Sequence, residues 1–369
     1  MKVLFDHQIF GWQEYGGIGR YAVELASSLS VVTDCKVSII APLYINKYLA
    51  EAPSTLQIHG VSVPSFHRCG RIYRFLNFWM SRVFIRRFRP DIVHETYYSK
   101  FATSSGSSKT VLTVYDMIHE KFQENFSLAD PTIREKEAAI RRADHIICIS
   151  DNTKKDLMDI YSVSSENISV VYPGISQSNE VTVKETCDNQ VRPFLFYVGS
   201  RAGYKNFSSF ITAVAGSAAL IEKYDIVCFG GGAFSHAELE KIRALGFSAG
   251  QVKQVSGSDE MLIRLYANAT AFIYPSIYEG FGIPPLEAMR EGCPVVCSCT
   301  SSLPEVVGDA AEMFDPYSTS DIRKSIERVL DSEDLRRVLI ARGKERARQF
   351  STAKCAQDTL SVYRAVLQK

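Results

Sequence analysis

Two glutamates flank a glycine loop in the second half of the chain. Glu279 begins the sequence EGFG, and seven residues separate it from Glu287. The apolar run Ala271–Tyr274 before the loop predicts a buried strand, and Pro284 and Pro285 after it suit the first turn of a helix. The free amides of a helix start attract anions, and carboxylates there can accept hydrogen bonds from sugar hydroxyls. The pattern indicates a site for an anionic ligand that also carries sugar hydroxyls.

The segment Tyr278–Ala288, YEGFGIPPLEA, resembles the donor-site signature of the retaining GT-B glycosyltransferases of family four. Glu279 and Glu287 have the E-x7-E spacing of that family. A capped surface helix with two solvated acids is the competing interpretation, but it does not explain Phe281, which looks exposed between two glycines. The resemblance covers nearly the whole chain. It implies an α/β GT-B fold, with two facing Rossmann-like domains, a central cleft and a C-terminal crossover helix.

Two cations follow the apolar run Phe194–Val198. Arg201 and Lys205 bracket a turn at the end of this predicted strand, and the resembling family grips the donor diphosphate with a similar arrangement. Cleavage of a sugar–phosphate bond leaves negative charge on the nucleoside diphosphate, which fixed cations can stabilise. No Asp-x-Asp pair is present to hold a divalent metal. We therefore expect neither a metal nor a cofactor. Two solvated surface cations are the alternative.

A second glycine loop follows the strand predicted at Lys2–Phe5. Gly16 and Gly17 precede a helical pattern at Tyr21–Leu29, and in the resembling family this loop faces the donor diphosphate. A plain glycine turn is the alternative. The spacing is not G-x-G-x-x-G, and no acid ends the strand predicted at Lys36–Ala41, which argues against a nicotinamide enzyme.

The resemblance thus implies a donor site made from both halves of the chain. Its binding residues would be Gly16, Gly17, Arg201, Lys205, Glu279, Gly280, Phe281, Gly282, Ile283 and Glu287, with Gly230, Gly231, Val255 and Ser256 beside the nucleobase. The run of three glycines at 230–232 can equally be a simple turn.

Polar and aromatic residues end two predicted strands of the first half, at 94–98 and 115–120. Ligands of open α/β sheets bind beyond the carboxyl ends of strands, so these loops are expected to face the acceptor. Many members of the resembling family have His-Asp at the second strand end, whereas here Tyr115 precedes Asp116. We assign Asp116 by this resemblance. His119 is a candidate catalytic residue by its chemistry, and a purely structural histidine is the alternative.

The segment Arg71–Arg89 interleaves six arginines with aromatic residues, RIYRFLNFWMSRVFIRRFR. Such a helix can lie on an anionic membrane. The favoured interpretation is that its aromatic face packs on the sheet and its arginines are solvated. Contact with lipid headgroups on the inner face of the membrane is the second hypothesis.

Domain boundaries follow from length and composition. The 369 residues are long enough for two or three domains. We expect an acceptor-side domain at 1–175, completed by a crossover helix at 352–369, a polar linker at 176–192, and a donor-binding domain at 193–351.

Overall composition narrows the class of protein. The net charge of +1 argues against a nucleic-acid binder, and nine cysteines, several in apolar runs, indicate a reducing cytoplasm. Cys293, Cys297 and Cys299 have no nearby histidine or fourth cysteine for zinc. We find no signal peptide and no membrane-spanning run.

The resemblance implies a retaining hexosyltransferase. It would move a sugar, mannose from GDP-mannose as the first choice, to a glycan or lipid-linked acceptor in bacterial polysaccharide or lipopolysaccharide synthesis. Four alternatives stay open: a UDP-sugar-dependent transferase, a sugar-nucleotide epimerase, a phosphorylase and a catalytically silent nucleotide-sugar sensor.

Overall fold

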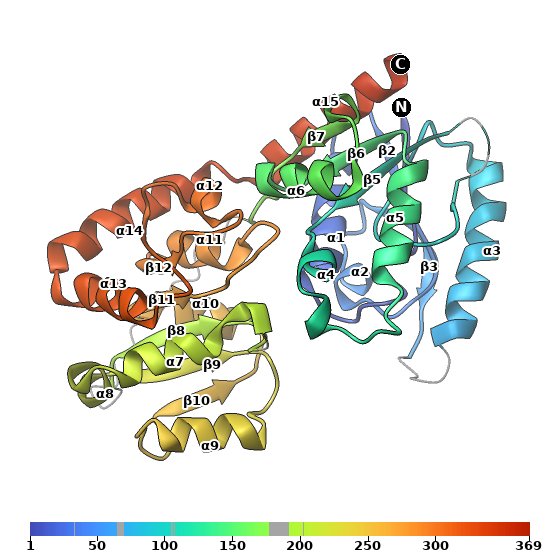
Figure 1. The fold of residues 1–369 in the computed structure, drawn as a ribbon. Helices are drawn as coiled ribbons and strands as arrows, with labels where there is room; N and C mark the ends of the chain where they lie inside the picture. Colours follow the sequence, from blue (N-terminus) through green and yellow to red (C-terminus); the bar gives the residue numbers. More distant parts are fainter. Residues whose placement is uncertain (33, 65–69, 105, 107, 177–191, 202) are drawn as a thin grey trace. The chain divides into compact units, whose positions relative to one another are not determined.

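The computed structural model describes residues 1–32, 34–64, 70–104, 106, 108–176, 192–201 and 203–369. All but the two end residues of the linker predicted at 176–192 lie outside these ranges. The chain forms two compact units, Met1–Gly174 with Ser351–Lys369, and Ile175–Phe350. Each unit has one sheet of parallel strands covered by helices (Figure 1). The predicted α/β fold with two Rossmann-like domains is confirmed.

The sheet of the first unit has the strand order β3-β2-β1-β4-β5-β6-β7. The order changes direction between β1 and β4, so the loops that follow these two strands diverge at the carboxyl edge of the sheet. The strands are β1 (Lys2–Phe5), β2 (Lys36–Tyr44), β3 (Gln57–Ser62), β4 (Ile92–Glu95), β5 (Lys109–Val114), β6 (His145–Cys148) and β7 (Ile168–Val170). The sequence interpretation missed β3, an edge strand with mostly exposed side chains.

Seven α-helices of the first unit are described: α1 (Gly17–Ser30), α2 (Lys47–Ala50), α3 (Gly70–Phe88), α4 (Ile118–Lys121), α5 (Thr132–Arg142), α6 (Asp151–Tyr161) and α15 (Thr352–Gln368). Ser150 caps α6 by accepting a hydrogen bond from the Thr153 amide at 3.0 Å. Helix α15 comes from the end of the chain, yet Tyr363 is fully buried with its hydroxyl 2.5 Å from His94 Nδ1 on β4. The last helix is thus part of the first unit's core.

Helix α3 corrects one expectation, because Phe75 and Trp79 point away from the sheet, whereas Phe88 at its end packs on the apolar core there. Phe75 and Trp79 are 63% and 56% exposed, whereas Asn77 and Ser81 are buried. The cause is polar: the Asn77 side chain accepts a hydrogen bond from the Leu43 amide at 2.7 Å and donates one to the Leu43 carbonyl at 2.8 Å. These bonds satisfy the backbone of β2 where its pairing with β3 is irregular.

The sheet of the second unit has the order β10-β9-β8-β11-β12-β13 and reverses between β8 and β11. Its strands are β8 (Phe194–Val198), β9 (Asp225–Phe229), β10 (Val252–Val255), β11 (Ala271–Tyr274), β12 (Val295–Ser298) and β13 (Ala311–Phe314). Its described helices are α7 (Phe207–Ala215), α8 (Ala218–Lys223), α9 (His236–Ala244), α10 (Asp259–Asn268), α11 (Ile283–Arg290), α12 (Leu303–Val307), α13 (Thr319–Asp331) and α14 (Glu333–Arg348).

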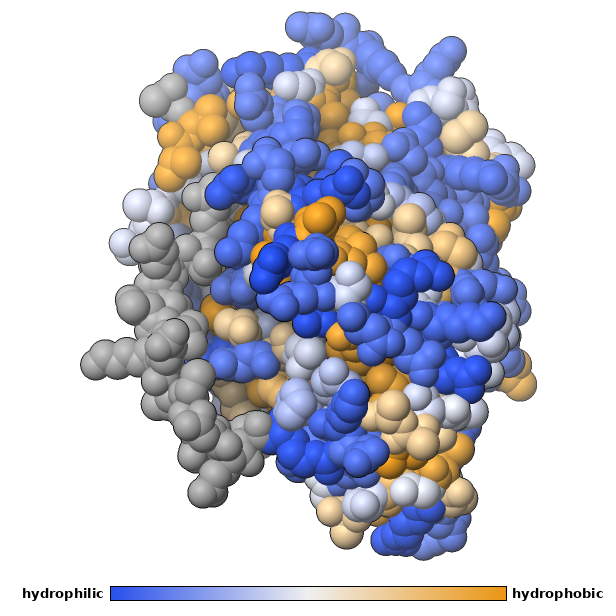
Figure 2. Space-filling model, turned by 90° about the vertical axis from the view of Figure 1, so that its left-hand side faces the viewer, coloured by the Kyte–Doolittle hydropathy of each residue, from blue (hydrophilic) through white to orange (hydrophobic). Residues whose placement is uncertain are grey.

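One apolar cluster holds the second unit together. Alternate residues of β8, β9 and β11 pack against α7, α13 and neighbouring helices, as the period of a strand requires. The surface in Figure 2 is mostly polar, with apolar side chains in small separate groups. On this side lies α14, whose Arg337 pairs with Glu333. This unit therefore buries its apolar residues in the ordinary way, unlike α3.

Candidate functional site

Lys205 and Glu279 meet where the second sheet reverses its strand order. Lys205 ends a short 3₁₀ turn after β8, and Glu279 lies in the loop after β11. Lys205 Nζ lies 2.7 Å from Glu279 Oε1, and both side chains are largely buried. The Lys205 ammonium also lies 5.8 Å from the centre of the Tyr274 ring. Two residues 74 positions apart in the sequence therefore form one charged pair at the strand ends.

A buried tyrosine holds each of the two glutamates. Tyr274 hydrogen-bonds to Glu279, and the pKa of Tyr274 is raised well above its usual value, first by burial and then by this carboxylate. Tyr266 on α10 lies with its hydroxyl 3.4 Å from Glu287 Oε2, and its pKa is raised for the same two reasons. A tyrosine that stays protonated remains a donor. Both carboxylates are thus oriented by neutral hydroxyl groups that the sequence motif does not contain.

Hydroxyl groups after β12 fix the loop that carries Glu279. Ser301 Oγ donates to the Glu279 carbonyl at 2.6 Å, and Ser302 Oγ lies 2.9 Å from the same oxygen and 2.7 Å from the Phe281 carbonyl. Thr300 Oγ1 donates to the carbonyl of Ile277 at 2.7 Å. We call these three residues, Thr300, Ser301 and Ser302, the serine cradle. The sequence analysis did not predict it, because the only sign of it in the sequence is the run CTSSLP.

Phe281 was expected to be exposed, and this is wrong. Its side chain is 2% exposed and packs on Phe350 with ring centres 5.6 Å apart. Gly282 follows at φ 113°, where a Cβ atom would lie 2.7 Å from Leu303 Cδ2, so this position needs glycine. Helix α11 starts at Ile283, with prolines in its first turn as predicted. Phe281 therefore anchors the loop, and its ring is not a ligand platform.

Arg201 is engaged more fully than the sequence suggests. Its guanidinium forms an ion pair with Glu238 at 2.6 Å, stacks 4.6 Å from the Phe234 ring centre, and donates to four carbonyls. These carbonyls belong to Gly230, Gly231, Gly232 and Ala233. The side chain is 4% exposed. Arg201 therefore shapes the loop after β9, and a direct contact with a diphosphate stays a prediction.

The three glycines after β9 all have left-handed backbone conformations, with φ between 71° and 80°. A Cβ atom on Gly231 would lie 2.7 Å from the Gly199 carbonyl oxygen, so a larger residue would displace backbone. Gln254 donates to the carbonyls of Gly230 and Val255 and lies 2.9 Å from Ser256 Oγ. The residues predicted beside the nucleobase thus form one connected loop surface within the second unit.

The other predicted phosphate loop lies in the first unit. Gly16 is the N-cap of α1, and Gly17 is its exposed first residue. The Gln13 side chain folds over this helix start and accepts a hydrogen bond from the Gly19 amide at 3.3 Å. A helix start is a favourable place for an anion, and Gln13 already satisfies one of its amides.

Asp116 and His119 lie at the start of α4, after β5. Asp116 Oδ1 accepts a hydrogen bond from the Ile118 amide at 3.0 Å. His119 stacks on Phe126 and lies 3.8 Å from Asp130, and burial, followed by the nearby Lys136, lowers its pKa. Lys136 is fully buried and donates to the Asp116 carbonyl at 2.9 Å. His119 is thus neutral near pH 7 and packed in place, and its catalytic role stays a prediction.

The second unit therefore holds Arg201, Lys205, Glu279 and Glu287, of which Lys205 and Glu279 are in direct contact, while Gly16, Asp116 and His119 belong to the first. Across the residues that the structure describes, there is no group of three His, Cys, Asp or Glu side chains that could hold a metal ion.

Two family models match most of the chain. The model described as "Glycosyltransferase Family 4" matches residues 15–179, and the one described as "Glycosyl transferases group 1" matches residues 181–346. A curated relative, O-antigen chain mannosyltransferase B of Escherichia coli, is 26% identical over 99% of this chain and 100% of its own length. The serotype-specific mannosyltransferase WbdA of Escherichia coli is 29% identical over 77% of this chain, which spans only 38% of WbdA.

The fold also matches solved structures. HepE from Anabaena, crystallised with UDP and glucose, superimposes with a TM-score of 0.75 at 16% identity, covering 99% of this chain and 100% of HepE. At this identity the likeness concerns the fold alone.

Proposed function

Because the chain belongs to the group 1 glycosyltransferases, we propose that it transfers mannose in the synthesis of a bacterial polysaccharide such as an O-antigen. The observation that carries this proposal is the full-length match to O-antigen chain mannosyltransferase B. The acceptor would be a glycan, free or lipid-linked, and the donor a nucleotide diphosphate mannose. GDP-mannose is the first choice. No cofactor besides the donor would be needed.

In this proposal, residues of the second unit would bind the donor. Lys205 would stabilise the departing diphosphate, and Arg201 would support it by holding the glycine loop or by direct contact. Glu279 would bind hydroxyls of the donor sugar, and Glu287 those of the ribose. The amides of Phe281, Gly282 and Ile283 at the start of α11 add donors for anionic oxygens. In the first unit, Gly16 and Gly17 would contribute further phosphate contacts.

The charged pair suggests how the site responds to its donor. In this structure Lys205 is neutralised by Glu279 at 2.7 Å. A diphosphate would compete for the ammonium, and sugar hydroxyls would compete for the carboxylate. Donor binding would thus replace the Lys205–Glu279 ion pair by a lysine–diphosphate contact and a glutamate–hydroxyl contact. Because neither charge is left without a partner, the free-energy cost of desolvating the two side chains stays small.

Retention of the anomeric configuration is part of the proposal. We assign no covalent nucleophile, so the acceptor would attack from the face that the diphosphate leaves, with a phosphate oxygen taking the acceptor proton. Asp116 and His119 would act on the acceptor side. NMR of the product's anomeric proton, read before mutarotation of any free sugar, would distinguish retention from inversion.

The donor is tested first by thermal shift. GDP, UDP, ADP and dTDP, each alone and as its sugar conjugate, should raise the melting temperature according to their affinity for the folded protein. A shift with GDP and GDP-mannose supports the proposal. A shift with UDP compounds alone would favour the UDP-sugar transferase. Transfer in the presence of EDTA would test the expected independence of metals.

Three other activities predict different outcomes with the same donor panel. An epimerase would convert the donor without any acceptor. A phosphorylase would depend on inorganic phosphate. A silent sensor would bind the donor tightly and release no nucleoside diphosphate with any acceptor pool.

Contact with the membrane is a second part of the proposal, and α3 supports it. Its outward face carries an apolar stripe at helical spacing, consisting of Ile72, Leu76, Met80, Val83 and Phe84, all at least 37% exposed. Phe75 and Trp79 on the same helix line a pocket and are not counted in this stripe. Arg86 and Arg87 extend from the last turn. An exposed apolar stripe with adjacent arginines is complementary to an anionic lipid surface. Within the described residues, no helix is long and apolar enough to cross a bilayer.

Vesicle flotation tests this contact. The protein should float with vesicles containing anionic lipid at low salt and less with zwitterionic vesicles. Val83→Glu should abolish flotation, because a carboxylate in the stripe opposes insertion. Val338→Glu, at an exposed position of the second unit, is the control. Failure of the wild-type protein to float would reject membrane contact and leave the enzymatic proposal intact. The same result would also reject the proposed location of the protein on the cytoplasmic face of the inner membrane.

A further inference from the structure

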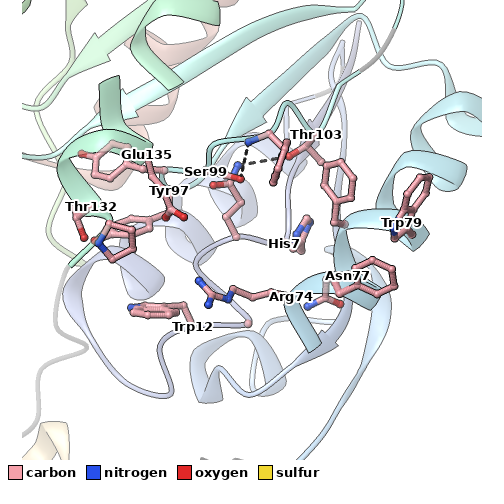
Figure 3. Close-up of a pocket in the computed structure, with 17 residues that line it drawn as sticks. His7, Trp12, Arg74, Asn77, Trp79, Tyr97, Ser99, Thr103, Thr132 and Glu135 are labelled. Carbon is pink, nitrogen blue, oxygen red and sulfur yellow. Dashed lines mark hydrogen bonds between the residues drawn. The ribbon is translucent and has the colours of Figure 1, made fainter. Parts of the chain in front are cut away.

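A pocket of about 610 Å³ lies at the carboxyl ends of β1 and β4, where the first sheet reverses its strand order. Its lining includes Gln8 and Trp12 after β1 and Tyr97 and Ser99 after β4, with α3 and the start of α5 beside them (Figure 3). The volume is typical of small-ligand sites, ~300–1,000 Å³. Open α/β sheets bind ligands at such reversals. All its lining residues belong to the first unit, so the pocket is complete within it.

None of the residues predicted for the donor or for catalysis lines this pocket. Asp6, the residue directly after β1, is also unavailable to a ligand. It is fully buried, and its carboxylate accepts hydrogen bonds from Thr96, Thr103 and Gln8. Asp6 ties the two loops behind the pocket together, and the pocket's surface comes from side chains beyond it.

Aromatic side chains dominate the lining. They are Trp12, Phe75, Phe78, Trp79, Tyr97, Tyr98 and Phe101. Trp12, Trp79 and Phe101 are 58%, 56% and 61% exposed, so more than half of the surface of each of these lining residues is accessible. Flat aromatic faces bury the apolar C–H face of a pyranose ring well. Neither tryptophan is needed for the fold's core, and both stand where a ligand would touch them.

Two opposite charges complete the pocket. Figure 3 shows Arg74 projecting into it above Trp12, with Glu135 on another wall beside Tyr97. The Arg74 guanidinium lies 5.3 Å from the Trp12 ring centre. Among the described residues, neither Arg74 nor Glu135 forms an ion pair within 4 Å. Both groups are therefore available to hydrogen-bond with hydroxyls, Arg74 as a donor and Glu135 as an acceptor.

The charges also decide between classes of ligand. A phosphate would gain from Arg74 but would meet the Glu135 carboxylate in the same pocket. An acyl or isoprenoid chain would cover both charges without giving either a hydrogen bond, which is costly. A neutral polyol satisfies both groups and the aromatic faces together.

We propose that this pocket binds a neutral hexopyranose unit of the acceptor glycan, stacked on aromatic side chains and held through its hydroxyls by Arg74 and Glu135. The identification of the glycan as the acceptor rests on the proposed function. The pocket's preference for a neutral sugar rests on its own residues.

Intrinsic fluorescence reports on the pocket directly, because the chain has two tryptophans and both line it. Titration with α-linked mannobiose and mannotriose should give a saturable change in tryptophan emission. Glu135→Gln should weaken the affinity by about tenfold, because the uncharged amide oxygen accepts a weaker hydrogen bond from a sugar hydroxyl than the carboxylate does. Glu137→Gln is the matched control, since Glu137 lies on the same helix, pairs with Arg141 and does not line the pocket. Melting temperatures of both variants would verify folding.

Three results would overturn the inference: no saturable change with either sugar, equal affinities for Glu135→Gln and the wild type, or saturable binding of polyprenyl phosphate in place of the sugars. Lys205→Ala separates this inference from the proposed function. It should keep the fluorescence titration and lose transfer. Sugar binding without consumption of GDP-mannose would reject the function alone, and transfer with no sugar binding here would reject the pocket alone.

Discussion

Both sheets reverse their strand order at one point, and the residues gathered there differ in kind. In the second unit, the loops after β8 and β11 bring Lys205 within 2.7 Å of Glu279. In the first unit, the loops after β1 and β4 bury Asp6 among hydrogen-bond donors and expose aromatic rings beyond it. Each sheet therefore has one equivalent position for a site, at the carboxyl ends of the two strands where its order reverses. The loops then build a charged site at one position and an aromatic pocket at the other.

This difference matches two kinds of ligand. A nucleotide sugar carries a diphosphate, which calls for cations and helix amides. A glycan end is uncharged and offers C–H faces and hydroxyls, which call for rings and paired hydrogen-bonding groups. The proposed functions of the two positions therefore follow from their loops and not from the sheets.

The largest expected effect is on the rate of transfer when the Lys205–Glu279 pair is broken. Lys205→Ala should lower kcat by ~10²–10³, because removal of one preorganised electrostatic contact to the leaving group typically costs this much. Lys223→Ala, at an exposed position of the same unit, is the control. Steady-state release of nucleoside diphosphate measures both. If Lys205→Ala turned over at a rate close to that of the wild type, the charged position in the second unit would not be the donor site.

Glu287→Ala should be almost as damaging. It removes the carboxylate expected to bind the ribose, so transfer should fall about a hundredfold, through the KM for the donor as well as kcat. Glu260→Ala, exposed on α10, is the control. The donor KM of Glu287→Ala at saturating acceptor is the decisive measurement, and an unchanged value would remove Glu287 from the site.

Acid should act on the first unit through His94. Burial lowers the pKa of His94 to about 4, against about 6.5 in the unfolded chain. Between pH 6.5 and 4 the unfolded chain therefore takes up a proton that the folded protein excludes. Stability falls as the pH falls, by about 3 kcal/mol in total from this residue.

Chemical unfolding of the wild type and His94→Gln across pH 4–7 isolates this effect. As the pH falls from 7 to 4, the free energy of unfolding of the wild type should decrease by about 3 kcal/mol relative to that of the variant. Burial raises the pKa of the neighbouring Glu95 to about 7, which changes stability in the opposite direction. This second effect is present in both proteins and cancels in the comparison. His236→Gln in the second unit is the control. If the difference in free energy of unfolding between the wild type and His94→Gln does not change with pH, the lowered pKa of His94 is contradicted.

The serine cradle should give the smallest effect. Ser302→Ala removes a hydroxyl that bonds to the carbonyls of Glu279 and Phe281, and loss of a partner for a buried carbonyl costs about 1–3 kcal/mol. If the loop loosens, kcat should fall about tenfold while the fold persists. Ser361→Ala on α15 is the control. An unchanged kcat would show that the loop holds Glu279 without Ser302.

The sequence predicted what is encoded in short contiguous patterns. The β–loop–helix block at 271–292 and the strand β8 were both predicted, since each depends on neighbours a few residues apart. The edge strands β3 and β13 were missed because half-solvated strands lack a continuous apolar run.

What the sequence did not predict depends on contacts between distant segments. The aromatic pocket combines residues near 8, 75, 98 and 132, and no spacing rule connects them. The orientation of α3 was predicted wrongly because aromatic residues usually face a core, whereas here Asn77 must face β2 to satisfy its backbone. Likewise Arg201 looked like a free cation, and only the fold reveals that it holds the glycine loop.

Helix α15 has a consequence for how the protein is made. Tyr363 fills the interior beside His94, yet it is synthesised after the whole of the second unit. Chains emerge from the ribosome amino end first, and domains generally fold in that order. Here the earlier half cannot complete its interior until the later half has been translated, so the second unit should be the first to reach its finished state.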